Sequence, residues 1–181
     1  MLPAGYMRKR VASNSEWLQA DGVTDIYSVS NCLSNNFADY INFWRHNGYW
    51  LFNSPAIIEE ISRAENIDLT NTKLFYYEVY EFEYDEHKRQ WVAFDPEASF
   101  ATEVAAPANM QLEGFDVVTF FAHTSPECSP LSCCALAKDL SVNQHCLFRT
   151  LAEAKEATDR GLFNNSEPGP YRIFSVYATA A

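Results

Sequence analysis

The chain has 181 residues, with 24 acidic and 13 basic side chains for a formal net charge of −11, and 48% of the residues are hydrophobic. This length fits one domain around a single core, and the aromatic share of 15% is far from that of disordered chains. Nucleic acid and anionic lipid bind clustered Lys and Arg, so the acidic balance argues against both as partners.

The first 22 residues contain no periodic apolar segment. We therefore predict an N-terminal tail over 1–22, partly flexible, and a single domain over 23–181. The basic triplet Arg8-Lys9-Arg10 is interpreted as part of the solvated tail. No apolar run follows these charges as a signal peptide requires, and no stretch reaches the roughly 20 apolar residues of a membrane span. The sequence thus predicts a cytoplasmic protein, and it shows no evident internal repeat.

Three elements are expected before residue 70. The β-branched segment 23–30 is a candidate edge strand. Apolar residues at helical spacing predict a helix from Ser34 that ends at Asn47-Gly48, where glycine can take a positive φ. Ser54-Pro55 is a typical helix start, with a capping residue before a proline. The expected buried face of this second helix comprises Ile57, Ile58 and Ile61.

A hairpin is the best strand signal. Aromatic and aliphatic residues alternate over 73–84, the polar loop 85–89 follows, and the chain returns as a strand over 90–95. The first strand also carries Glu78, Glu81 and Glu83, so we expect its far end to have one face in water. The segment 99–106 is a weaker strand candidate.

The last third begins with a buried-type strand over 115–122. Ser129-Pro130 repeats the capped start and predicts a helix to about residue 140, and 144–148 can form a strand. Thr150 and Glu153 have the spacing of a capping box, and Gly161 fits the end of that helix. The segment 171–179 closes the chain as a strand. Together these elements predict an α+β fold: one domain, with a mostly antiparallel sheet of about five or six strands and helices packed on one face.

Cysteine and histidine are the residues to search for a metal site. Six of them lie close together in the sequence, but their spacing does not match the paired ligands of structural zinc, so we predict neither metal nor cofactor. Whether they converge in space is left open. The odd count of five cysteines favours reduced thiols over a disulfide framework. The six residues are His123, Cys128, Cys133, Cys134, His145 and Cys146.

A cysteine nucleophile is the second candidate chemistry. Cys32 precedes the helix predicted from Ser34, where unpaired amides lower a thiol pKa, and His46 is one candidate base. Cys128 and Cys133 lie beside the Ser129-Pro130 helix start and have the same electrostatic claim.

Two groups of residues are candidate binding surfaces. The first is a helix end and turn rich in aromatic residues, of the kind that dominates recognition surfaces: Trp44, Arg45, His46, Asn47, Tyr49 and Trp50. Its alternative is a helix terminus whose aromatics fill the core. The second is the acidic strand face of Glu78, Glu81 and Glu83, whose alternative is a solvated surface.

The chain has no GxGxxG, P-loop, HExxH, GxSxG or EF-hand motif. Charge and aromatic content favour a small acidic protein-binding domain of the immunity or inhibitor type, which engages a basic protein partner. The alternative is an enzyme or small-ligand-binding domain with a site near the turn 45–50, which uses a cysteine nucleophile.

Overall fold

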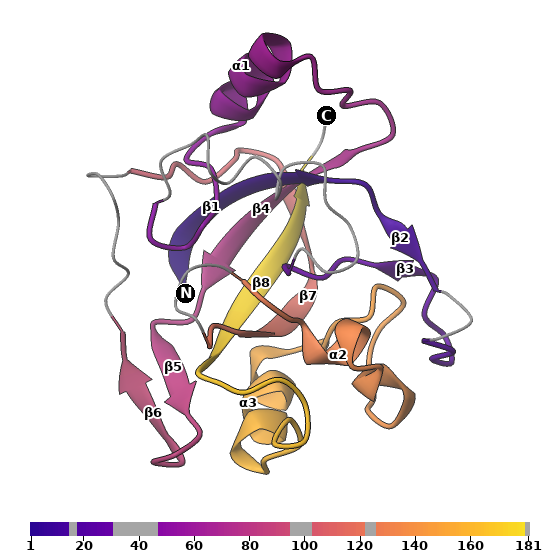
Figure 1. Ribbon diagram of the computed structural model, residues 1–181, viewed down its shortest axis with the longest axis vertical. Helices are drawn as coiled ribbons and strands as arrows, with labels where there is room; N and C mark the ends of the chain where they lie inside the picture. The colour runs from indigo at the N-terminus through magenta and orange to yellow at the C-terminus, as the bar shows by residue number, and fades with distance from the viewer. Residues whose placement is uncertain (15–17, 31–46, 95–102, 122–125, 180–181) are drawn as a thin grey trace.

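A computed structural model describes residues 1–14, 18–30, 47–94, 103–121 and 126–179. Four long strands lie side by side in the order β1-β4-β8-β7, each antiparallel to its neighbour (Figure 1). β5 and β6 form a hairpin in which β5 pairs with the first residue of β8. β2 and β3 make a separate small sheet. The strands are β1 (Leu2–Lys9), β2 (Ala12–Ser13), β3 (Asp25–Ile26), β4 (Lys73–Val79), β5 (Phe82–Asp85), β6 (Gln90–Ala93), β7 (Met110–Thr119) and β8 (Tyr171–Thr179).

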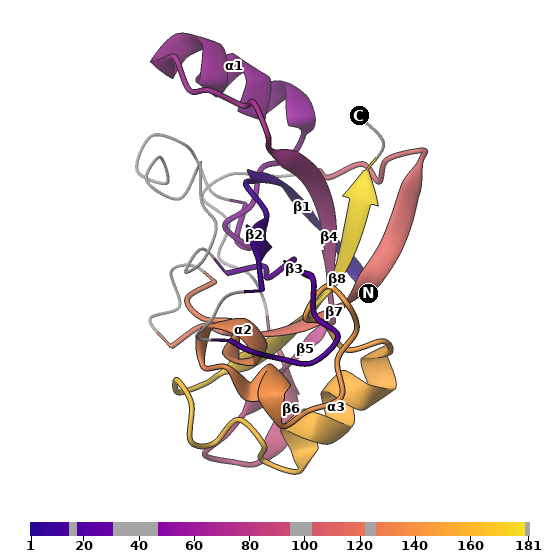
Figure 2. The ribbon, with the colours of Figure 1, turned by 90° about the vertical axis from the view of Figure 1, so that its right-hand side faces the viewer.

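The helices are α1 (Pro55–Glu65), α2 (Pro130–Cys133), the 3₁₀ turn η2 (Leu136–Lys138) and α3 (Leu151–Asp159). α1 and α3 lie at opposite ends of the sheet in both ribbon views (Figures 1 and 2). The predicted α+β class, a single domain with a mostly antiparallel sheet, is confirmed. In the part of the chain that the structure describes, no helix has the length and apolarity needed to cross a membrane.

The prediction of an N-terminal tail is wrong for residues 2–9. They form β1, which pairs with β4 from Leu2 opposite Val79 to Lys9 opposite Lys73. The basic triplet is likewise not all solvated, because Lys9 is only 1% exposed. The short run of Ala4, Tyr6 and Met7, all buried, was too brief to give a periodic signal against the neighbouring charges.

The other strong predictions are confirmed. Ser54 and Pro55 begin α1, whose Ile58 is fully buried. Thr150 and Glu153 form the complete capping box of α3. The hairpin exists as β5 and β6, although a break after Val79 separates β4 from β5. β8 has the predicted bounds.

Five expectations differ from the structure or lie, wholly or in part, outside the described residues. The segment 144–148 is a tight turn in place of a strand, and the helix expected to residue 140 stops at Cys133, because Ala135 takes a left-handed conformation with φ +56°. The segment 23–30 is a strand only at Asp25–Ile26. Residues 103–106 form no strand, whereas 99–102 and the helix predicted over 34–46 lie outside the described residues.

The two halves of the described chain share a structural repeat. In each, a strand with a bulge passes a glycine, Gly5 or Gly114, whose φ is +138° or +150°. At either glycine an added Cβ would lie 2.6 Å from a carbonyl oxygen, that of Phe52 or of Phe148. Only glycine fits such an approach.

An asparagine organises the turn beside each glycine. Asn47 donates to the carbonyl of Ala4 at 2.7 Å and accepts from the amides of Tyr49 and Leu51. Asn143 donates to the carbonyl of Glu113 at 2.6 Å and accepts from the amides two and four residues later. A helix follows each turn, with Ser54 or Thr150 at its N-cap position. The Thr150 side chain makes the capping hydrogen bond, whereas the Ser54 side chain makes none within the described residues.

An approximate twofold axis relates the two halves and passes through the sheet between β4 and β8. Tyr77 pairs with Val176 across β4 and β8, and their outer partners are Gly5 and Gly114. One row of residues thus reads Gly5-Tyr77-Val176-Gly114 and is symmetric about its centre. The two halves therefore repeat in structure although the sequence shows no evident repeat, because they share few residues.

Candidate functional site

A covering segment, residues 23–30, lies against the sheet and is held by Lys9. The Lys9 ammonium donates to the carbonyl oxygens of Ser28 at 2.8 Å, Val29 at 2.5 Å and Ser30 at 2.8 Å. A buried ammonium is expensive unless it is well hydrogen-bonded, and these carbonyls supply such partners. Lys9 thereby fixes the end of the covering segment that leads into residue 31.

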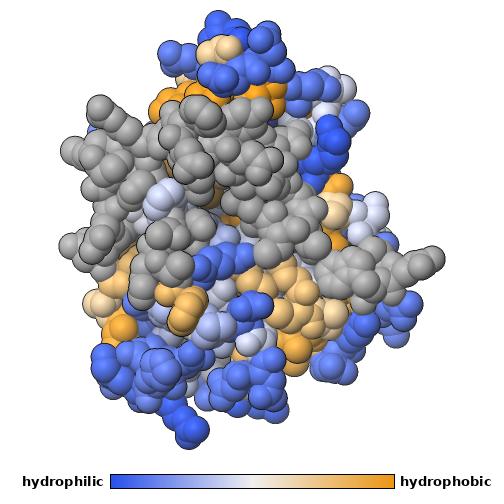
Figure 3. All heavy atoms as spheres, viewed as in Figure 1, coloured by the Kyte–Doolittle hydropathy of each residue, from blue (hydrophilic) through white to orange (hydrophobic). Residues whose placement is uncertain are grey.

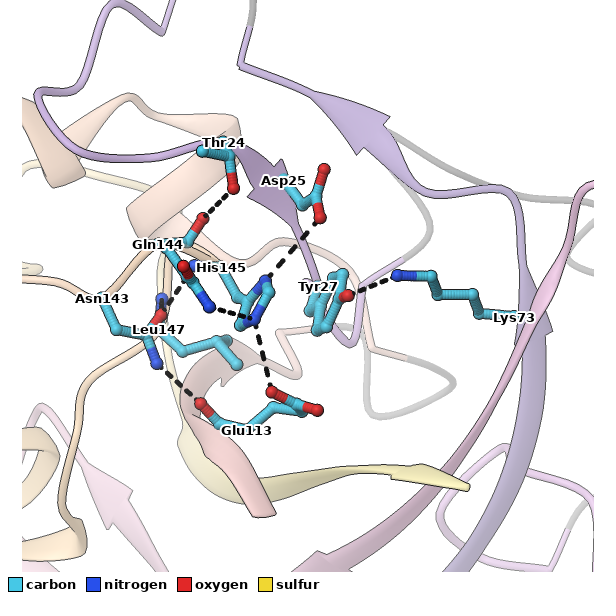
Figure 4. Close-up of polar contacts among 9 residues, drawn as sticks. All are labelled: Thr24, Asp25, Tyr27, Lys73, Glu113, Asn143, Gln144, His145 and Leu147. Carbon is cyan, nitrogen blue, oxygen red and sulfur yellow. Dashed lines mark hydrogen bonds and ion pairs between the residues drawn. The ribbon is translucent and has the colours of Figure 1, made fainter. Parts of the chain in front are cut away.

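The other end of the covering segment is held by the turn 143–147 (Figure 4). The amides of Thr24 and Asp25 both donate to the carbonyl of Gln144, and the Tyr27 amide donates to that of His145. The His145 ring stacks on Tyr27 with centroids 4.0 Å apart.

The contacts between the covering segment and the turn 143–147, which we call the clasp, are reinforced by charged side chains. Glu113 Oε2 lies 3.3 Å from His145 Nε2, and Asp25 Oδ2 lies 3.9 Å from Nδ1. Lys73 donates to the Tyr27 hydroxyl at 2.6 Å. In Figure 4 the imidazole lies between the two carboxylates, which come from β3 and β7. The cluster thus fastens the covering segment to the sheet.

Asp116 on β7 lies beneath the covering segment and is 1% exposed. Its Oδ2 accepts from the Val29 amide at 2.8 Å and from the Ser129 hydroxyl at 2.6 Å. Burial raises the pKa of the Asp116 carboxyl to about 7, and these two hydrogen bonds limit the rise. Its Oδ1 and the hydroxyl of buried Tyr77 have no hydrogen-bond partner within the described residues. Buried polar atoms without partners are uncommon and are one mark of a functional site.

The same network joins Asp116 to a thiol. The Ser30 amide donates to Ser129 Oγ at 3.2 Å, and Ser30 Oγ lies 3.5 Å from Cys133 Sγ. Negative charge on Cys133 also raises the pKa of Asp116. The carboxyl therefore positions both the covering segment and the start of α2, which carries Cys133.

We call the adjoining cavity the thiol pocket. It has a volume of about 310 Å³ and is lined by Thr119, Phe121, Glu127, Cys128, Cys133, Cys134 and Glu167. None of these lining residues is basic. Hydrophobic side chains gather over α2 on the face shown in Figure 3, whereas α1 is mostly hydrophilic. The pocket thus combines three thiols with apolar and acidic walls.

A second cavity, which we call the acidic pocket, adjoins the first at Phe121. Its volume is about 240 Å³, and Phe121, which is 62% exposed, lines both cavities. The other lining residues are Glu83, Asp85, Glu86, His87, Gly169 and Pro170. Carboxylates therefore lie in both cavities, and a cation would be attracted to either.

The structure describes only part of the predicted aromatic turn. Cys32, Trp44, Arg45 and His46 lie outside the described residues. Asn47 is 1% exposed and Tyr49 is 9% exposed. Asn47 organises its turn as described above, and Trp50 in the same turn has φ +59°. In the described part of this turn, Asn47 and Tyr49 are thus buried, whereas Trp50 is partly exposed.

The predicted acidic strand is largely engaged within the protein. Glu78 accepts from the Tyr177 hydroxyl at 2.8 Å, and Glu83 accepts from Arg172 Nε at 2.9 Å. Glu81 is exposed. Glu83 also lines the acidic pocket.

The six clustered Cys and His residues converge only in part. Cys128, Cys133 and Cys134 meet in the thiol pocket, whereas His145 belongs to the clasp and His123 lies outside the described residues. Cys146 is buried in the core, and burial raises its pKa to about 12. Within the described ranges no group of three or more His, Cys, Asp or Glu side chains is arranged to hold a metal ion.

Sequence reasoning missed Lys9, Asp116 and Ser129. The available signals were a lysine just after a short run of apolar residues and an aspartate inside an apolar strand, since charged residues at such positions are buried only with partners.

The chain matches no protein-family model, and neither the curated proteins nor the solved structures include one significantly similar to it.

Proposed function

We propose that the protein binds a small neutral or cationic molecule in the thiol pocket, where a cysteine thiol can react with it. The observation that carries this proposal is the meeting of three thiols in a cavity of about 310 Å³ beside a buried carboxyl. This volume lies within the range of about 300 to 1,000 Å³ that small-molecule sites occupy. The site belongs to the ligand-binding alternative that the sequence left open, but it lies at α2 and not at the turn 45–50.

The walls of the thiol pocket favour positive charge in the ligand. Glu127 and Glu167 contribute carboxylates, and the adjoining acidic pocket adds Glu83, Asp85 and Glu86. A phosphate or carboxylate ligand needs Arg, Lys or a group of amides, and the described residues that line the thiol pocket include no basic side chain. Phe121 offers an aromatic surface on which a cationic or apolar group can pack.

The Asp116 network makes the pocket preorganised. It connects the covering segment to Ser129, the residue before α2, so the start of the helix that carries Cys133 is fixed before a ligand arrives. A preformed site loses less conformational entropy on binding than a site that must order itself. This is a physical reason to place a buried carboxyl at this position despite the cost of its burial.

The test compares two reagents that form the same kind of mixed disulfide but carry opposite charges. These are the trimethylammonium-ethyl and sulfonato-ethyl methanethiosulfonates, with the modified cysteines identified by peptide mass spectrometry. We expect Cys133 and Cys134 to react faster with the cationic reagent. At about 6 Å in water, one carboxylate changes the relative energies of the two reagents by about 1.4 kcal/mol, or tenfold in the rate ratio.

Matched variants separate the pocket from the overall charge. The double variant Glu127→Gln/Glu167→Gln should lower the rate ratio about tenfold or more at low salt. Glu59→Gln/Glu60→Gln removes two charges from the distant helix α1 and should change it much less. Equal effects of the two double variants, or no reaction at Cys133 and Cys134, would contradict the proposal.

A second candidate function is the binding of a basic protein partner, as the sequence favours. The net charge of −11 and the carboxylates of the acidic pocket support it, since complementary charge accelerates association. Capture from the source lysate with a salt titration tests it. A partner whose binding weakens with salt and with Glu86→Gln would support this function, whereas binding indifferent to both would exclude it.

A further inference from the structure

Two thiols of the thiol pocket are in contact with each other. Cys128 Sγ and Cys134 Sγ are 3.7 Å apart. A disulfide has a length of about 2.05 Å, so the sulfurs need a further approach of about 1.7 Å, which side-chain rotation can supply in part. We propose that Cys128 and Cys134 form a reversible disulfide that regulates the thiol pocket.

The third thiol of the pocket is engaged elsewhere. Cys133 Sγ lies 3.5 Å from Ser30 Oγ and 4.0 Å from Ser132 Oγ, so it faces the covering segment. A bond between adjacent Cys133 and Cys134 would close a very small strained ring. The geometry therefore selects Cys128 and Cys134 from among the three thiols.

The backbone holds both partners in place. Cys128 pairs with Thr119 beside β7: its carbonyl accepts from the Thr119 amide at 2.8 Å, and its amide donates to Thr119 Oγ1 at 3.2 Å. The Cys134 amide donates to the Pro130 carbonyl at 3.2 Å and so closes α2. The two thiols thus extend from fixed points on either side of a short helix, and their proximity does not depend on a long loop.

Exposure assigns the order of the steps when the oxidant is a peroxide. Cys134 is partly exposed, whereas Cys128 is 4% exposed. The Cys134 thiolate attacks the peroxide, an S–O bond forms as the O–O bond breaks, and water leaves from hydrogen peroxide. The Cys128 sulfur then attacks this sulfenic acid, the S–S bond forms, the S–O bond breaks, and a second water carries away the oxygen. Two thiols are oxidised by two electrons, and one peroxide is reduced.

The consequence for the pocket rests on the proposed function. The disulfide removes two of the three thiols and draws together the two sides of α2, so Cys133 remains as the pocket thiol. We therefore expect the oxidised protein to react with the cationic methanethiosulfonate at Cys133 and not at Cys128 or Cys134. A dithiol reductant restores the original state.

The experiment treats the full-length reduced protein with hydrogen peroxide near pH 7 and follows intact mass and non-reducing peptide maps. We expect a loss of about 2 Da, for two hydrogens, and a Cys128–Cys134 linked peptide that dithiothreitol releases. Cys128→Ser and Cys134→Ser should both lose this product, whereas the matched control Cys133→Ser, a change in the same pocket, should retain it.

Two outcomes would overturn the proposal: a disulfide that maps to another pair of cysteines, or oxidation only to sulfinic acid. The intact mass and the peptide map are both independent of ligand binding. If the linked peptide forms but the charge selectivity of the reduced pocket is absent, the disulfide stands and the proposed function fails. If the selectivity is present and no linked peptide forms, the proposed function stands and the switch fails.

Discussion

Replacing Asp116 by Asn tests the buried carboxyl at the centre of the site. The amide keeps an oxygen for the Val29 amide and the Ser129 hydroxyl, and its nitrogen takes the place of the unpartnered Oδ1, but it cannot ionise. In the wild type the carboxyl pKa rises from 3.8 to about 7 on folding. At about 1.4 kcal/mol for each factor of ten, this rise corresponds to about 4 kcal/mol.

The sign of the effect follows from proton binding. Between pH 3.8 and about 7 the folded state keeps a proton that the unfolded state releases. The stability that Asp116 contributes is therefore fully present below the lower value and is lost as the pH rises through the upper one. Asp116→Asn removes this dependence on pH. The free energy of unfolding of the variant, relative to that of the wild type, should therefore increase by about 4 kcal/mol from acidic to mildly alkaline pH.

The assay is urea unfolding of both proteins, followed by tryptophan fluorescence, at several values between about pH 4 and pH 8. The other titrating groups are common to both proteins and cancel in the difference between their free energies of unfolding. If this difference stays constant within about 1 kcal/mol over the pH range, the Asp116 carboxyl does not have a pKa raised by burial. Ser129→Ala gives a directional check, because loss of its hydrogen bond should raise the pKa of Asp116 further.

Two further predictions concern the supports of the site and are measured by chemical or thermal unfolding. Lys9→Met should lower the free energy of unfolding by about 3 kcal/mol or more, because three buried carbonyls lose a donor, whereas Arg10→Met, at an exposed position, should cost much less. Similar losses of unfolding free energy in Lys9→Met and Arg10→Met would contradict the role of Lys9. Gly5→Ala and Gly114→Ala should each cost more than about 2 kcal/mol and by similar amounts, since both meet a carbonyl at 2.6 Å with positive φ. A tolerated alanine at either position would contradict the structural repeat.

Elements specified by local chemistry could be predicted from the sequence. The capping box at Thr150 and the proline after Ser54 state where their helices begin, because the backbone needs those groups at that place. The alternation of apolar residues in β8 likewise reflects a period of two that only a strand satisfies. These elements depend little on the rest of the chain.

Elements specified by long-range contacts could not be predicted in this way. The segment 144–148 has the composition of a short strand, but Asn143 bonds both to β7 and to the backbone of this segment and holds it as a turn. β1 is stable because β4 offers it a partner about 70 residues later in the chain. The sequence indicates a solvated tail at Lys9 and gives no sign of a site at Asp116, because their partners, carbonyl oxygens and a serine hydroxyl, lie in other segments of the chain.

The candidate site was anticipated in residue type but not in place. On electrostatic grounds the sequence favours Cys128 and Cys133 as much as Cys32, and it places the candidate ligand site at the turn 45–50. What distinguishes the pocket cysteines is the approach of the covering segment and the loop before α2, and both depend on the folded sheet.

The central claim is that the thiol pocket is the place where a ligand binds and reacts. A crystal structure of the protein after reaction with one equivalent of the cationic methanethiosulfonate tests it most directly. We expect an adduct on Cys133 or Cys134, with its ammonium group near Glu127 or Glu167 and its stem against Phe121. An adduct located mainly on Cys32, or on a thiol with its ammonium group away from these carboxylates, would rule out the thiol pocket as the ligand site.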